Sequence, residues 1–334
     1  MDPLSRELFH FSVIVFWPGF HPGAEKHRVA NAWGSLALQE PALFDALMCA
    51  AIIHIQARIG DRIFKLARLR YYQRAIELLR MELSQSSCSL RVELIMAISF
   101  LQVDDRGGTT NDGPRASISV PFRSLQWLDD FSCQPFVEAH RDALTKMITG
   151  RGIDCLEVRG LSSLAQYFDI ISSTINLTQP ALPQSQQYRD AHKYETRPTA
   201  SGHDDEFSIV YSNDLELIWT RLVVNFGLSH SYVDLILGLR TLSGLFDVCQ
   251  SNPPGDINSS RLATHRNLIQ YRLLSTIDET DPGDSWLCGR VTDLVRSTLL
   301  MFTICVTFPI ACQATLKRLL KQMKTTIERL PGRF

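Results

Sequence analysis

The chain has 334 residues, which is enough for one large domain or two ordinary ones with a full hydrophobic core. Its 34 lysines and arginines nearly balance its 35 aspartates and glutamates. The net charge of -1 therefore excludes a basic field over the whole chain of the kind that attracts nucleic acid. Hydrophobic residues make up 45% and charged residues 21% of the sequence, which excludes an acidic, disordered chain.

Helix signals dominate the first hundred residues. We expect a helix from Pro41 to about Gly60, because proline suits the first helical turn and glycine suits the residue after the last one. Asp61 is a suitable cap for the next helix, over residues 62–83. A third helix is predicted over residues 89–103.

Three polar segments interrupt the helical pattern, at residues 104–120, 179–207 and 251–260. Each is rich in glycine, proline, asparagine or serine, so we predict loops there. The segment 179–207 is the longest, and we expect it to be mobile.

Further helices are predicted from Pro121, from Pro135, and over residues 161–177, 208–226, 231–249, 260–277, 285–308 and 313–330. The apolar residues of the last helix form one stripe: Leu316, Leu319, Leu320, Met323, Ile327 and Leu330. Strand-like segments at residues 12–16 and 118–120 are too short to build a sheet. The sequence therefore predicts an all-α fold, a single large helical domain of roughly ten helices in an irregular array of helical hairpins.

Two apolar runs were tested as membrane segments. The run over residues 8–20 is short and ends at Pro18 and Gly19, so it is only a weak signal peptide. Residues 297–316 are long enough to span a bilayer, but they contain several hydroxyl side chains and Pro309. We interpret them as a buried helix, a turn at the proline and the start of another helix, and we expect no membrane association.

Eight cysteines are scattered along the chain, and no two form a C-x-x-C pair. We interpret them as reduced, buried thiols of an intracellular protein. Cys305 and Cys312 are the nearest pair, but no second pair lies close to them in the sequence. A zinc site needs four ligands, usually delivered as two tight pairs, so no metal ligand is predicted.

Acidic pairs in an all-α chain raise the alternative of a magnesium-dependent enzyme of terpene-synthase type, which needs an aspartate-rich cluster to hold its metal ions. Neither Asp104 with Asp105 nor Asp129 with Asp130 is followed by the further acid that such a cluster requires. In the third candidate, Asn213 and Asp214, Leu217 replaces the hydroxyl ligand. We interpret these acids as helix ends and solvated side chains.

No arrangement for nucleophilic catalysis is found either. Ser243 lacks the first glycine of a nucleophile elbow, and the nine histidines show no zinc-protease spacing. His54 lies on an apolar helix and is interpreted as a core or boundary histidine, whereas His230 and His265 are caps or surface groups. No catalytic, cofactor-binding or metal-binding residue is therefore predicted, and no cofactor.

Basic residues are concentrated in residues 58–80 and in the last helix. The arginines of the first stretch are spread around the helix rather than aligned, so we expect solvated or ion-paired side chains. No DNA-binding residue is assigned.

Four blocks in a characteristic order resemble one protein family. They are residues 33–38 with 40–51, residues 72–79 (YQRAIELL), residues 140–148 with 151–153, and a C-terminal group at 271–275, 296–302 and 317–330. Together they resemble the fungal-specific transcription factor domain, the helical regulatory domain of fungal zinc-cluster transcription factors. The resemblance covers roughly residues 28–330 and leaves residues 1–27 as an N-terminal extension.

The resemblance implies a non-catalytic regulatory domain that acts in the nucleus through contacts with protein coregulators or with a second copy of itself. Members usually carry a six-cysteine zinc cluster before this domain. Residues 1–27 contain no cysteine, so we expect this chain to lack the cluster and to reach DNA only indirectly or through such a missing module. A fragment, a misassigned gene start and a natural relative without the cluster all stay open. A small-molecule effector held between helices is also left open, as are target genes, activation or repression, and oligomeric state.

Overall fold

The computed structural model describes residues 1–21, 25–59, 64–84, 91–103, 122, 124–132, 134, 136–149, 152–156, 158, 160–195, 223–224, 228–251, 256–277, 286–310 and 312–330. Almost all of this part of the chain is helical, and its only strand-like feature is an isolated bridge between Val103 and Phe136. The prediction of an all-α fold is confirmed.

The described residues divide into two compact units. Unit 1 comprises the described residues from Met1 to Ser172, except Phe122. It also includes Ala181–Gln187. Unit 2 comprises Phe122, Ser173–Pro180 and the described residues from Tyr188 onward. Each unit has its own buried side chains, so each is described by itself below.

The N-terminal residues form part of the core of unit 1. Helix α1 (Pro3–Phe11) begins at Asp2, whose side chain accepts the backbone N–H of Ser5 at 3.0 Å. A π-helical turn, η1 (Ser12–Phe16), then leads into the short α2 (Trp17–Phe20), and α3 (Lys26–Gln39) follows. Phe16, Trp17 and Phe20 are fully buried, so the segment expected to be an extension contributes core side chains.

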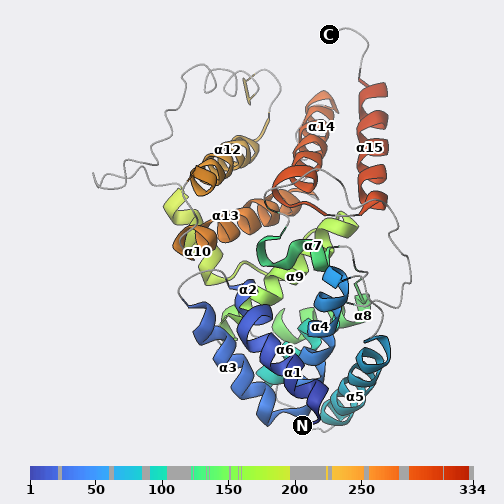
Figure 1. Ribbon diagram of the computed structural model, residues 1–334. Coiled ribbons are helices and arrows are strands. Elements are labelled where there is room, and N and C mark those ends of the chain that lie inside the picture. Colours follow the sequence, from blue (N-terminus) through green and yellow to red (C-terminus); the bar gives the residue numbers. More distant parts are fainter. Residues whose placement is uncertain are drawn as a thin grey trace. The chain divides into compact units, whose positions relative to one another are not determined.

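Helix α4 (Pro41–Ile59) is the central helix of unit 1 and packs against α5 (Lys65–Ser84) and α6 (Val92–Leu101) (Figure 1). It begins at Pro41 as predicted, while the predicted stop and cap at Gly60 and Asp61 lie outside the described residues. Unit 1 also contains η2 (Leu125–Trp127), α7 (Leu128–Phe131), α8 (Glu138–Thr149), η3 (Ile153–Cys155) and the first three quarters of α9 (Leu161–Asn176).

The predicted polar loop at 179–207 was wrong over its middle, where residues form α10 (Gln186–Glu195). Asp154 supplies the N-terminal cap, since its Oδ1 accepts the backbone N–H of Gln186 at 2.7 Å. The residues before α10 are fixed by two buried side chains of α9. Asp169 Oδ2 accepts the N–H of Leu182 at 2.8 Å, and Gln166 Nε2 donates to the carbonyl of Pro183 at 3.1 Å.

The other two predicted loops have different outcomes. Residues 104–120 lie outside the described part of the chain. Within 251–260, helix α13 (Asp256–Ser275) already begins at Asp256, so the break is shorter than predicted.

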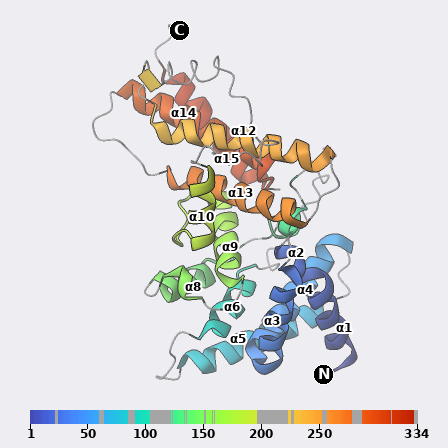
Figure 2. The same ribbon diagram turned by 90° about the vertical axis from the view of Figure 1, so that its left-hand side faces the viewer.

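Unit 2 is formed by long helices. Helix α12 (His230–Ser251) packs along α13, as Figure 2 shows, and α14 (Trp286–Phe302) lies beside α15 (Gln313–Glu328) in Figure 1. Its interior contains buried polar side chains. Arg266 is 1% exposed and donates from Nε and Nη2 to Asn267 Oδ1, at 3.1 and 2.9 Å.

The apolar run at residues 297–316 has the predicted organisation. The end of α14 continues into a π-helical turn, η5 (Thr303–Thr307), the chain turns at Phe308 and Pro309, and α15 begins at Gln313. Among the described residues, no helix is both long and apolar enough to cross a membrane.

Candidate functional site

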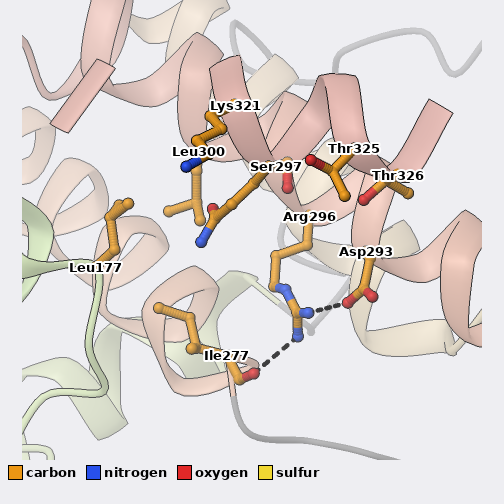
Figure 3. A pocket seen from close by; sticks show the side chains of 10 residues that line it. Leu177, Ile277, Asp293, Arg296, Ser297, Leu300, Lys321, Thr325 and Thr326 are labelled. Atoms are coloured by element: carbon orange, nitrogen blue, oxygen red, sulfur yellow. Dashed lines mark hydrogen bonds and ion pairs between the residues drawn. The ribbon is translucent and has the colours of Figure 1, made fainter. Parts of the chain in front are cut away.

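A cavity of about 430 Å³ lies in unit 2 between α14 and α15 and the ends of α9 and α13 (Figure 3). Its volume falls within the usual range for small-molecule sites. The lining residues are Leu177, Ile277, Asp293, Arg296, Ser297, Leu300, Lys321, Gln322, Thr325 and Thr326. They come from four elements that are distant in sequence, so only the tertiary structure brings them together.

The end of α9 is held by α15. Thr315 Oγ1 donates to the carbonyl of Ile175 at 2.6 Å, and the Arg318 guanidinium donates to the carbonyls of Ile175 and Asn176. These carbonyls are among the last of the helix and have no partner within it, so side chains must satisfy them. A cation at this end also interacts favourably with the helix dipole.

Leu177 follows directly and has φ of 54°, in the left-handed region that favours glycine. Its N–H bonds to the carbonyl of Thr174 and the next N–H, of Thr178, bonds to Ser173, the pattern of a Schellman motif. A leucine in this conformation costs about 1–2 kcal/mol relative to glycine. This strained residue lines the cavity, and strained backbone is commonest at sites with a function.

The end of α13 is held in the same manner by α14. Arg296 Nη1 donates to the carbonyls of Thr276 and Ile277, at 2.7 and 3.0 Å. Its Nη2 pairs with Asp293, one turn earlier on α14, as the dashed lines of Figure 3 show. Arg296 is therefore fully committed to the protein.

The remaining polar side chains of the cavity make no hydrogen bond or ion pair within the part of the chain that the structure describes. They are Ser297, Lys321, Gln322, Thr325 and Thr326. Lys321 is exposed at the edge, whereas Ser297 is only 8% exposed. Figure 3 shows Lys321 on the same side as Leu300 and Leu177, with Thr325 and Thr326 opposite. The cavity thus presents one cation, several hydroxyls and an aliphatic wall.

A second feature of unit 2 is the exposed apolar stripe of α15, which we define as Leu316, Leu320, Met323 and Ile327. Thr315 and Leu319 face the interior and are buried. Leu320 and Ile327 remain 57% and 53% exposed, and Leu316 and Met323 are half-buried. The sequence predicted one apolar stripe on this helix, but of its residues the structure fully buries only Leu319.

Of the acidic pairs considered for metal binding, only Asp129 and Asp130 lie among the described residues. Their interpretation as solvated acids was wrong for Asp130, which is 3% exposed. Its Oδ2 lies 2.7 Å from His54 Nδ1 and 3.1 Å from Arg58 Nε. Burial of this carboxylate is compensated by two partners from α4, and no group of three metal-ligating side chains occurs in the described ranges.

The interpretation of His54 as a core histidine is confirmed, since it is 1% exposed and stacks on Phe16 with ring centroids 5.0 Å apart. Ser243 donates to the carbonyl of Leu239, four residues earlier in α12, as helical serines commonly do. His230 is exposed at the start of α12 and His265 is half-buried on α13.

Three of the basic side chains that the structure describes within residues 58–80 have different surroundings. Arg58 pairs with Asp130, Arg74 Nε lies 3.3 Å from Asp45 Oδ2, and Arg68 is buried. The interpretation of the cysteines as buried holds for Cys49 and Cys288, but Cys305 is exposed, on η5.

None of the cavity residues was predicted as a site from the sequence. Ser297 lies in an apolar run and Lys321 on the charged side of an amphipathic helix, and both patterns are too common to mark a site. The cavity depends on Arg296 and Arg318 reaching the ends of other helices, and such contacts leave no local pattern in the sequence.

A family model, described as the fungal specific transcription factor domain, matches residues 29–236. This chain belongs to that family. The match covers more than half of the chain, from α3 into α12, and confirms the resemblance inferred from the sequence blocks. The family assigns a transcription-regulatory role to the chain.

Comparison with curated proteins and with solved structures gave no match. The cavity and the α15 stripe lie almost wholly beyond residue 236, outside the matched part of the fungal specific transcription factor domain.

Proposed function

We propose that this chain regulates transcription in the nucleus through contacts with coregulator proteins and performs no catalysis. Membership of the fungal specific transcription factor domain family supports the regulatory role and the nuclear location. The observation that carries the protein-contact mechanism is the exposed apolar stripe of α15.

The stripe has the spacing of a helix that packs against another helix. Leu316, Leu320, Met323 and Ile327 are separated by four, three and four residues, which places them along one side. Large exposed apolar side chains grouped in this way are typical of interaction sites. Such a stripe loses contact with water when an amphipathic partner helix covers it.

The charges beside the stripe favour a particular partner. Lys317, Lys321 and Lys324 are exposed along one flank, and Lys324 lies 3.8 Å from Glu328. A segment that combines apolar with acidic residues complements this surface. A second α15 is less suitable, because its own lysines would meet these lysines and repel them.

The proposed absence of catalysis is supported by the structural roles of those residues considered for chemistry that the structure describes. Asp130 holds His54 and Arg58, and Ser243 donates to its own helix. We propose that DNA is reached only through another DNA-binding module or protein, since Arg58 and Arg74 are paired with acids and Arg68 is buried.

The test tethers the full chain to a reporter promoter through a heterologous DNA-binding domain, in fungal cells. The Leu320→Glu variant places a negative charge in the stripe and should reduce the transcriptional effect at least fivefold. Ala314→Glu adds the same charge at an exposed position of α15 outside the stripe and should leave the effect unchanged. Imaging of the fluorescently tagged chain should show nuclear accumulation.

Equal activity of both variants at equal protein levels would contradict the role of the stripe. Light scattering after size-exclusion chromatography tests the second-copy alternative. A dimer that Leu320→Glu converts to a monomer would show that the stripe binds another copy of the chain, contrary to the coregulator proposal.

A further inference from the structure

The charges of the cavity in unit 2 are unbalanced. Its lining contains two cations, Arg296 and Lys321, and one carboxylate, Asp293. Arg296 is committed to Asp293 and to the carbonyls at the end of α13. Lys321 makes no ion pair with any described residue, so a single positive charge at the cavity edge is uncompensated.

Ser297 is a polar residue of the cavity wall and is largely buried. The residue is 8% exposed and lines the cavity, and its hydroxyl bonds to no described residue, not even to the carbonyl one turn earlier. Other hydroxyls of these helices, such as those of Thr298 and Thr303, do bond to their own helix. A hydroxyl that lines the cavity and makes no bond within the described part of the chain is available to a ligand.

Two of the three residues of the aliphatic wall, Leu177 and Leu300, lie on the same side as the lysine in Figure 3. Leu177, Ile277 and Leu300 form the wall, and Figure 3 shows Lys321 beside Leu300. The left-handed conformation of Leu177 directs a large apolar residue to a position where helix ends usually have glycine. A charge and an apolar wall together suit a ligand that has both.

We propose that this cavity binds a small amphipathic monoanion, a carboxylate with a short aliphatic chain. Lys321 and Ser297 donate to the carboxylate, and Leu177, Ile277 and Leu300 pack against the chain. A cation would be repelled by Lys321, and a polyanion would find only one uncompensated charge. The binding property is separate from the protein-contact mechanism and does not depend on it.

Isothermal titration calorimetry on the full chain tests the proposal, with octanoate as the probe and octylamine as its cationic counterpart. Octanoate should bind at one site per chain, at least tenfold more tightly than octylamine. Lys321→Met should raise the Kd of octanoate at least tenfold, and Lys321→Glu should reverse the preference. Ser297→Ala should raise the Kd at least threefold.

Lys317→Met is the matched control, because it removes a lysine of α15 that does not line the cavity, and it should leave the Kd unchanged. Leu320→Ser removes an apolar side chain of the exposed stripe and should also leave it unchanged. Far-UV circular dichroism confirms that each variant remains folded.

Three outcomes would overturn the proposal. They are equal affinity for octanoate and octylamine, an unchanged Kd in Lys321→Met, and loss of binding in Leu320→Ser, which would move the site to the α15 stripe.

Discussion

The two units use different interiors. In unit 1, aromatic rings contact one another around α4: Phe20 lies within 6.5 Å, centroid to centroid, of Trp33, Phe100, Phe131 and Phe168. In unit 2, buried polar side chains bond to one another and to backbone carbonyls. Arg266 donates to Asn267 and to the carbonyl of Phe122, and Gln270 donates to Thr174 Oγ1 at 3.0 Å.

The difference indicates why the candidate site lies in unit 2. Aromatic rings pack closely, and their contacts require only a suitable orientation of the rings. A core of such rings leaves little room for a ligand. Polar side chains hold helix ends at defined distances, as Arg296 and Arg318 do beside the cavity. Directional hydrogen bonds can therefore keep a cavity open where close packing would close it.

The largest expected effect is in the aromatic core. Trp33→Ala removes a fully buried ring that contacts Trp17, Phe20 and Phe100, and should lower the free energy of unfolding by about 3–5 kcal/mol. Urea unfolding followed by far-UV circular dichroism measures it. Leu38→Ala, on the exposed side of α3, is the control and should change stability by less than about 0.5 kcal/mol. A loss below 1 kcal/mol for Trp33→Ala would contradict the role of the ring cluster.

A smaller effect is expected from the polar interior of unit 2. Arg266→Met retains much of the volume but deprives Asn267 Oδ1 of two donors and the carbonyl of Phe122 of one. Loss of hydrogen bonds from a buried charged group should reduce stability by about 2–3 kcal/mol in the same unfolding assay. Lys317→Met, at an exposed position of α15, should change it by less than about 0.5 kcal/mol. Equal stability of Arg266→Met and the parent would show that these bonds do not hold the unit together.

The smallest effect is a pH dependence in unit 1. Burial raises the pKa of the Asp45 carboxyl to about 6, although Arg74 partly opposes the shift. The folded chain therefore binds a proton that the unfolded chain has released, so the Asp45 contribution to stability falls as pH rises from about 4 to about 6. Asp45→Asn removes this fall and should be more stable than the parent at pH 7.5 by about 1–2 kcal/mol.

Urea unfolding at pH 4.5, 6 and 7.5 measures this dependence. The variant Glu77→Gln, at an exposed position of α5, should follow the parent profile. If the free energies of unfolding of the parent and of Asp45→Asn changed by the same amount between pH 4.5 and 6, the Asp45 carboxyl would be charged throughout this pH range.

Much of the fold follows from local patterns. The starts of α4 at Pro41 and of α15 at Gln313, and the separation of α14 from α15 near Pro309, were predicted from proline positions and from helical periodicity. Helix α10 was not predicted, because its residues are polar and its cap, Asp154, is 32 residues away. Sequence periodicity cannot show a cap supplied by a distant segment.

The last helix shows the same limit. Periodicity placed Leu319 and Leu320 in one apolar stripe, but Leu319 is 1% exposed and Leu320 is 57% exposed. The position of α14 beside α15 decides which of the two is covered. Likewise, the apolar run at residues 8–20 did not show that Phe16 and Trp17 are buried in the core of unit 1.

The sequence by itself determined the all-α class and most helix positions, because helical periodicity and caps act over a few residues. It also determined the family, because the sequence blocks of the family follow one another in a characteristic order along the chain. The tertiary structure alone decided the cavity, the buried partners of Asp130 and Arg266, and the exposed side of α15. Each of these depends on side chains from distant segments meeting within hydrogen-bonding or van der Waals distance. Only the packed chain sets such distances.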